Sequence, residues 1–384
     1  MALVNRRMLL ITGGAAAVVT AGTGTLAWWP GTASATQPWR DAGKALGDPR
    51  LDALAYAILA PNPHNRQPWQ YRLVDEDRID ISCDLSRRLP QTDPFDRQIV
   101  VGFGCMIELL VMAAAAKGYS SVVTLWPDGE PQPRLDARRV ASVQLIRNPA
   151  ERPDPLFEHA LARRSTKEVY SVKPVTADAL GRLVGEPVAG GVVAGGSVDP
   201  ASIAALRELT WEAWMAEYRD AAMRRESIDL MRIGNAEIVA NPDGIELGGL
   251  FMGLGKMTGM ITRETLDTPG TTAFQQGIDM FKPIMESAQG HVWLVTPGNS
   301  RAEQIAAGRR WVRMNLQAQA LGIAIHPLSQ ALQETKAMAG PYAEVHERLG
   351  ARDGAVVQML ARIGYALFPE PTPRWPLKTH LVAA

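Results

Sequence analysis

The residues best suited to hold a ligand occur in two short polar stretches that lie far apart in the chain. Residues 60–71, APNPHNRQPWQY, are called the elbow below. Pro61 and Pro63 disfavour a helix, so the helical pattern before them must end near Ala60. The result is a stiff polar loop whose side chains and free backbone amides can meet a ligand. An ordinary helix-to-strand loop that packs Trp69 into a core is the alternative.

The second stretch, residues 163–167, reads Arg-Arg-Ser-Thr-Lys and places three cations beside two hydroxyls. Arginine offers a planar fork of donors, serine adds an O–H donor, and Lys167 can reach a second acidic position on a ligand. This combination predicts a cradle for a phosphate group. The alternative is a helix end with solvated charges, which is the usual state of Arg and Lys.

Composition narrows the class of protein. The 384 residues carry 40 basic and 40 acidic side chains, so no electrostatic argument favours nucleic acid as a partner. With 46% hydrophobic and 21% charged residues the chain is of ordinary globular type. Its length suffices for one large or two ordinary domains.

The cysteines and histidines do not predict a metal site. Cys83 and Cys105 are too few for a disulfide framework, and the six histidines show no ligand spacing. We expect both cysteines to be buried free thiols, although a single bridge between them remains open.

The first 35 residues are typical of an export signal. Arg6 and Arg7 precede an apolar, Gly/Ala-rich run that ends at Pro30, and residues 33–35, Ala-Ser-Ala, form a small-residue cleavage pattern. We interpret residues 1–35 as a twin-arginine signal peptide, which places the protein in the periplasm or outside the cell. The alternative is an uncleaved membrane anchor, because residues 8–29 could span a bilayer.

The pattern of elements predicts an α+β fold with antiparallel-type sheets flanked by helices. Strands are expected up to residue 74 and at residues 79–83, 121–125, 140–146, 291–297 and 354–365. Helices are expected from residue 49 and at residues 98–117, 200–233 and 301–321. The Gly-rich residues 190–196 are expected to form a loop.

A polar link at residues 147–155 suggests two halves, residues 36–150 and 151–384. Within the second half, residues 241–266 are rich in glycine and methionine. Because glycine lowers order and methionine adapts its shape, this segment could be a mobile lid over a pocket. A loosely packed pair of helices is the alternative.

Both polar stretches resemble parts of the FMN-dependent nitroreductase superfamily. The elbow is similar to its "APS..N.QPW.F" loop, and residues 163–170, RRSTKEVY, are similar to its "RRS.R.F" or "RHSTK.F" opening. In ordinary members that opening precedes the QPW loop in one domain, and two subunits share each flavin. Here the order is reversed, which, with the twin-arginine leader, resembles the Acg-type branch.

Four further segments carry this resemblance, which spans about residues 50–377. They are SRRLPQTDPFDR (86–97), NPDGI (241–245), HPLSQ (326–330) and PEPTPRWP (369–376). The resemblance implies a nitroreductase-like fold in which two pseudo-symmetric halves mimic a homodimer. It also implies one FMN per chain, with the second pseudo-symmetric site empty.

The site residues implied by the resemblance come from both halves. They are Asn62, Pro63, Asn65, Gln67, Arg163, Arg164, Ser165, Lys167, Pro327, Ser329, Gln330 and Arg374. In this scheme the arginines hold the phosphate, and Lys167 lies near the pyrimidine edge. No side chain is assigned a catalytic role, because the flavin carries the chemistry.

The implied function is two-electron reduction of a nitroaromatic, quinone or similar acceptor, with NAD(P)H as a possible donor. Export places the protein where NAD(P)H is scarce, and the lid could exclude it. The alternative is therefore an exported protein that stores or sequesters FMN with little turnover. The twin-arginine translocase is the expected partner during export, and a monomer or weak dimer is the expected state.

Overall fold

The computed structural model describes residues 31–185 and 190–383. The strands are β1 (Trp69–Val74), β2 (Arg78–Cys83), β3 (Tyr119–Leu125), β4 (Ala141–Arg147), β5 (Val193–Ser197), β6 (Met231–Ile233), β7 (Ile245–Leu247), β8 (Gly290–Thr296), β9 (Ala324–Pro327) and β10 (Val356–Gly364). The helices are α1 (Gln37–Asp41), α2 (Pro49–Ala57), α3 (Arg97–Ala116), α4 (Ala177–Val184), α5 (Pro200–Arg219), α6 (Ala221–Asp229), α7 (Asn235–Ala240), α8 (Leu250–Met257), α9 (Arg263–Asp267), α10 (Thr272–Glu286), α11 (Arg301–Ala320) and α12 (Ala339–Arg348).

Two antiparallel four-stranded sheets form the framework. The first has the order β1-β2-β4-β3, and the second has the order β5-β8-β10-β9. A short parallel pair, β6-β7, lies apart from both. The predicted α+β class is therefore confirmed. The division into halves at about residue 150 stays a prediction, although one sheet comes from residues 69–147 and the other from residues 193–364.

Helix ends follow local signals in the sequence. The Asp48 side chain accepts a hydrogen bond from the Arg50 amide at the start of α2, and Pro49 occupies the first turn. Gly118 follows α3 with φ near +76°, a conformation that glycine adopts without a steric penalty. Ser300 and Glu303 form a reciprocal capping box that begins α11.

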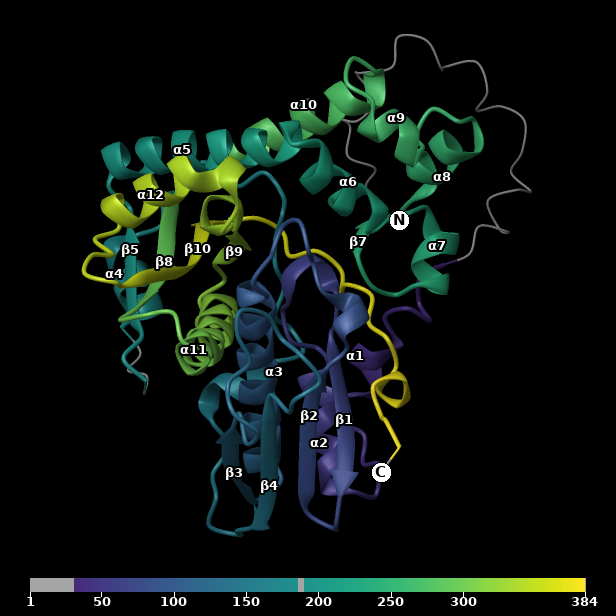
Figure 1. Ribbon diagram of the computed structural model, residues 1–384, viewed down its shortest axis with the longest axis vertical. Coiled ribbons are helices and arrows are strands. Elements are labelled where there is room, and N and C mark those ends of the chain that lie inside the picture. The colour runs from purple at the N-terminus through teal and green to yellow at the C-terminus, as the bar shows by residue number, and fades with distance from the viewer. Residues whose placement is uncertain (1–30, 186–189, 384) are drawn as a thin grey trace.

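Helices α3 and α11 pack against each other between the two sheets (Figure 1). They cross at Gly104 and Gly308, where a Cβ added to Gly104 would lie 2.8 Å from the Gly308 Cα and would overlap the Ile305 carbonyl. A Cβ added to Gly308 would overlap the Val101 carbonyl. Only glycine lets the two backbones approach this closely.

Two expectations about secondary structure were wrong. Residues 193–197 form β5 instead of a loop, because Gly195 and Gly196 leave room for the side chains of Trp293 and Leu180. The glycines therefore mark close packing in a strand.

The expected single helix over residues 200–233 is also divided. Asp220 has an extended backbone between α5 and α6, and its carboxylate caps α6 by accepting hydrogen bonds from the amides of Ala222 and Met223. Residues 231–233 then pair with β7 as strand β6.

Cys83 and Cys105 are both buried and free, so the structure contains no bridge between them. Helix α3 is the one helix in the described ranges that is long and apolar enough to cross a membrane, and 83% of its most apolar window is buried inside the protein. The predicted twin-arginine motif and the apolar run to residue 29 lie outside the described residues.

Replacing Gly308 with alanine should lower the free energy of unfolding by about 1–3 kcal/mol, because the added methyl group overlaps the backbone of α3. The measurement is urea denaturation at equilibrium. Gly181→Ala in α4 is the matched control, since its added Cβ meets no atom within 4 Å. The control should instead be stabilised by about 1 kcal/mol through helix propensity. Equal behaviour of the two variants would contradict the tight crossing.

Candidate functional site

The elbow concentrates backbone strain. His64, Asn65 and Gln67 have φ values of 45°, 51° and 50°, in the left-handed region that residues other than glycine rarely adopt. Within the elbow, the Asn62 side-chain oxygen accepts a hydrogen bond from the Gln67 amide at 2.7 Å. Such strain persists only where the surroundings hold it in place, and it clusters at functional sites.

Distant parts of the chain hold the elbow in this shape. Gln67 is fully buried; its side-chain Nε2 donates to the Pro242 carbonyl at 2.9 Å, and its Oε1 accepts from the Trp375 backbone amide at 2.9 Å. The Asn65 side-chain oxygen accepts from Nη1 of Arg374 at 2.6 Å. Segments 241–245 and 369–376, which the sequence singled out, therefore meet the elbow directly.

Two buried arginines converge on the start of the elbow. Nη2 of Arg163 and Nη2 of Arg374 donate to the Leu59 carbonyl, at 3.2 and 3.3 Å, and each residue is only 3% exposed. Nε and Nη1 of Arg163 and Nε of Arg374 are buried without a hydrogen-bond partner among the described residues. Two guanidinium groups thus share one carbonyl while several of their donors stay unused.

Neither arginine forms an ion pair within the described chain: no carboxylate acts on Arg163, and Glu246 acts on Arg374 only at a distance. Burial and the neighbouring Arg164 lower the pKa of Arg163 to about 10. Burial and then Arg163 lower the pKa of Arg374 to about 9, while Glu246 acts in the opposite direction. Both groups remain charged at pH 7, in a place that would favour a bound anion.

Trp39 in α1 lies against these arginines, although no sequence pattern singled it out. The guanidinium carbons of Arg163, Arg164 and Arg374 lie 5.9, 4.8 and 5.5 Å from its ring centroid. Its indole N–H donates to the Thr372 carbonyl at 2.8 Å. An aromatic face attracts cations, so Trp39 holds the three guanidinium groups together. We call Arg163, Arg164 and Arg374 the arginine cluster; Figure 1 shows α1 beside the C-terminal segment that contributes Arg374.

Lys167 lies at the open side of the site. Its side chain is exposed to solvent, yet the protein atoms around it lower its pKa by partial desolvation. The carboxylate of Glu246 partly opposes that shift. Burial and then Lys167 likewise lower the pKa of the half-buried His64 to about 4, so its imidazole is neutral at pH 7. Lys167 therefore lies near both His64 and Glu246, at the exposed side of the site.

The remaining predicted residues lie on β9 and the turn after it. The Thr166 amide donates to the Ile325 carbonyl at 2.9 Å, which places residues 163–167 along the edge of β9. Pro327 ends that strand, and Ser329 and Gln330 begin a 3-10 turn. No hydrogen bond joins these three residues to the elbow within the described ranges.

Arg164 also ties the arginine cluster to the C-terminal segment, because its Nε donates to the Pro369 carbonyl at 3.2 Å. Ser165, beside it, is half-buried. The predicted lid folds as β7, α8 and α9, and its base is tied to the elbow by the Gly244 amide, which donates to the Asn65 carbonyl at 3.3 Å. Its motion stays a prediction.

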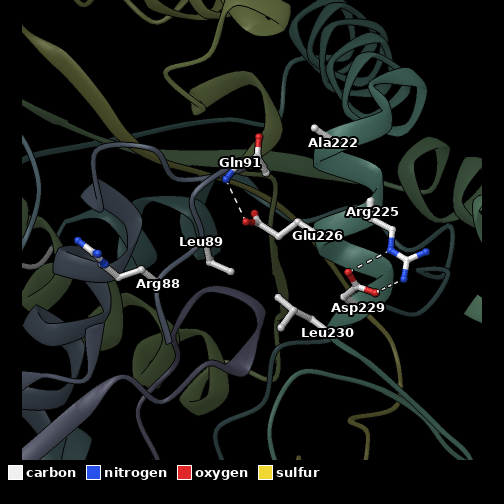
Figure 2. A pocket seen from close by; sticks show the side chains of 8 residues that line it. All are labelled: Arg88, Leu89, Gln91, Ala222, Arg225, Glu226, Asp229 and Leu230. Atoms are coloured by element: carbon white, nitrogen blue, oxygen red, sulfur yellow. Dashed lines mark hydrogen bonds and ion pairs between the residues drawn. The ribbon is translucent and has the colours of Figure 1, made fainter. Parts of the chain in front are cut away.

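A separate cavity of about 420 Å³ lies between the loop after β2 and helix α6 (Figure 2). The Gln91 amide donates to the Glu226 carboxylate across it at 2.9 Å. Its lining contains none of the predicted site residues. This cavity is therefore distinct from the site at the elbow.

Comparison with known proteins gives one consistent likeness. No family model matches the chain. Two curated proteins from two strains of Mycobacterium tuberculosis, CDC 1551 / Oshkosh and H37Rv, are each 25% identical to it over 333 residues. These matches cover 84% of this chain and 87% of each relative, and the H37Rv protein is named "Putative NAD(P)H nitroreductase Rv3131".

Two solved structures of proteins named as nitroreductases also align with the chain. A "putative nitroreductase" from Anabaena variabilis aligns over 86% of this chain and 91% of its own, with 11% identity and a TM-score of 0.46. The FMN-dependent nitroreductase NfnB from Mycobacterium smegmatis, in complex with NADPH, aligns over 58% of this chain and 96% of its own, with 17% identity and a TM-score of 0.35. Over 333 residues the chain is thus similar in sequence to proteins named as putative nitroreductases, and its own helices and antiparallel sheets form an α+β fold.

Proposed function

We propose that the chain is an FMN-binding oxidoreductase and that the elbow and the arginine cluster hold the flavin. The observation that carries the proposal is the pair of buried guanidinium groups, Arg163 and Arg374, which share the Leu59 carbonyl and keep unused N–H donors. A phosphate group offers several acceptor oxygens and negative charge to such donors. The curated relatives named as NAD(P)H nitroreductases support the same reading.

The residues present fit FMN in charge and polarity. The arginine cluster would hold the phosphate, and Trp39 would keep its guanidinium groups in place. Lys167 brings a positive charge close to His64 and Glu246, and this charge would favour a bound group that gains negative charge on reduction. When bound, FMN would supply the transfer of two electrons from a donor such as NAD(P)H to a small nitroaromatic, quinone or similar acceptor.

We also propose that the two halves imitate a homodimer and bind one FMN per chain. The elbow and the QPW motif occur once, before residue 150, and the RRSTK opening occurs once, after it. Because one chain supplies both parts, a second subunit is not needed to complete the site. The protein is then a monomer or a weak dimer.

Arg163→Gln should weaken FMN binding by about ten- to a hundredfold, since it removes a charge-assisted contact worth about 1.5–3 kcal/mol. Fluorescence titration of the stripped protein with FMN measures this, and Arg348→Gln on the exposed end of α12 is the control. The stripped Arg163→Gln protein should unfold at no lower urea concentration than wild type, because an unneutralised buried charge is removed. Unchanged affinity would place the phosphate elsewhere.

A storage protein that binds FMN without turnover is the competing function. Stopped-flow mixing of the loaded protein with NADPH, and separately with a reduced quinone, distinguishes the two. We expect at least one donor to bleach the flavin absorbance and a nitroaromatic or quinone to restore it. Bound flavin that neither donor reduces would favour storage.

We further propose that the twin-arginine translocase exports the protein and that its leader stays uncleaved as a membrane anchor. The predicted cleavage pattern ends at Ala35, which is 3% exposed. Its carbonyl accepts a hydrogen bond from the Arg374 amide at 2.8 Å, and its amide donates to the Thr32 carbonyl at 3.0 Å. A peptidase needs an accessible backbone, and this bond is buried beside the arginine cluster.

Protein recovered from membranes should therefore have the intact mass of the chain, with residues 1–35 retained. Trp39→Ala should increase the fraction that begins at Thr36, because losing the indole loosens this segment from the arginine cluster. Intact-mass spectrometry of membrane and soluble fractions measures both. Soluble wild-type protein that begins at Thr36 and carries FMN would contradict an uncleaved anchor.

A further inference from the structure

Arg362 is a fully buried cation whose donors are directed to specific acceptors. Its Nη2 donates to the Glu168 carbonyl at 2.7 Å, and its Nη1 donates to the Ser287 hydroxyl at 3.1 Å. Its guanidinium carbon lies 3.8 Å from the ring centroid of Tyr170. Arg362 forms no ion pair with a carboxylate in the described part of the chain. Because Nη2 also donates to the Thr166 carbonyl at 3.4 Å, Arg362 holds the backbone on either side of Lys167.

The remaining donor of Arg362 determines the tautomer of His326. The two residues are cross-strand partners in β10 and β9, and Nε of Arg362 lies 2.9 Å from Nδ1 of His326. Burial lowers the pKa of Arg362 to about 10, so it stays protonated at pH 7 and Nε–H can only donate. Nδ1 must therefore accept, and the imidazole proton must be on Nε2.

The surroundings also keep His326 neutral. Burial lowers its pKa well below the usual value, and the charges of Arg362 and Lys167 lower it further. Helix α10 contributes the uncharged ring of Phe281, edge-on at 6.2 Å between centroids. His326 is 4% exposed, and the one hydrogen bond of its side chain among the described residues joins Nδ1 to Arg362. The Nε2–H group is therefore available to donate to a ligand or to water.

We propose that Arg362 locks His326 as an Nε2–H donor which, with Lys167, binds an oxygen atom of the ligand held beside the elbow. The ligand is an aromatic compound that presents a carbonyl or nitro oxygen, and this assignment to a ligand rests on the proposed function. Because the imidazole is neutral and Nδ1 is occupied, His326 donates a hydrogen bond to the ligand and transfers no proton, and Arg362 is the positioning residue that acts through it. The oxygen belongs either to the electron acceptor or to the flavin.

The tautomer can be tested without cofactor or turnover. Full-length protein labelled with ¹⁵N-histidine should show one imidazole, absent in His326→Gln, with a protonated Nε2 and an accepting Nδ1. That imidazole should stay neutral on acidification from pH 8 to pH 5. A proton on Nδ1, or protonation near the ordinary histidine pKa, would overturn the lock even if FMN binds as proposed.

The ligand assignment is tested with His326→Leu, which has no donor, and His326→Gln, which keeps one. In loaded protein with 2-methyl-1,4-naphthoquinone, the leucine variant should raise KM about two- to tenfold, as expected for one lost hydrogen bond, and glutamine should restore most of it. Weaker FMN binding with unchanged quinone KM would assign the oxygen to the flavin and would support the same donor. If neither FMN binding nor quinone KM changes in the leucine variant, the proposed role is wrong.

Discussion

The close approach of α3 and α11 is the constraint on which the rest of the structure depends. Gly104 and Gly308 let the two backbones touch, and Glu108 in α3 adds ion pairs to Arg309 at 2.6 Å and Arg313 at 3.1 Å in α11. The first sheet packs near one helix and the second sheet near the other (Figure 1). The position of the elbow relative to Arg163 therefore follows from this crossing, since the elbow leads into β1 of the first sheet and residues 163–167 lie along β9 of the second.

The elbow illustrates how local strain is maintained by distant contacts. Three residues in the left-handed region would not persist in an isolated loop. Gln67 compensates by hydrogen bonding to residues 175 and 308 positions away, Pro242 and Trp375. These contacts hold the elbow in one shape. The carbonyl of Leu59, the residue just before the elbow, accepts hydrogen bonds from the guanidinium groups of Arg163 and Arg374.

Electrostatics in the site are arranged in two layers. The arginine cluster and Trp39 form a buried positive end, and Lys167 and Glu246 form an exposed end. Buried cations without anionic contacts reduce the stability of the folded protein unless something offsets them. Within the chain, the aromatic face of Trp39 and the backbone carbonyls stabilise these charges. A bound anion would stabilise them more strongly than these neutral groups do.

The sequence by itself determined the α+β class, most element positions and the segments that meet at the site, because hydrophobic periodicity, prolines and cap residues act over a few neighbours. The loop expected at β5 was wrong, because Gly195 and Gly196 pack against the side chains of Trp293 and Leu180 in a strand. The break between α5 and α6 at Asp220 was not predicted either. Trp39 and Arg362 could not be placed, because a single residue carries no local signal, and His326 was not assigned to the site although it begins the HPLSQ segment. Only tertiary structure decided that three arginines surround one indole and that Arg362 sets the tautomer of His326, since these contacts join residues far apart in the chain.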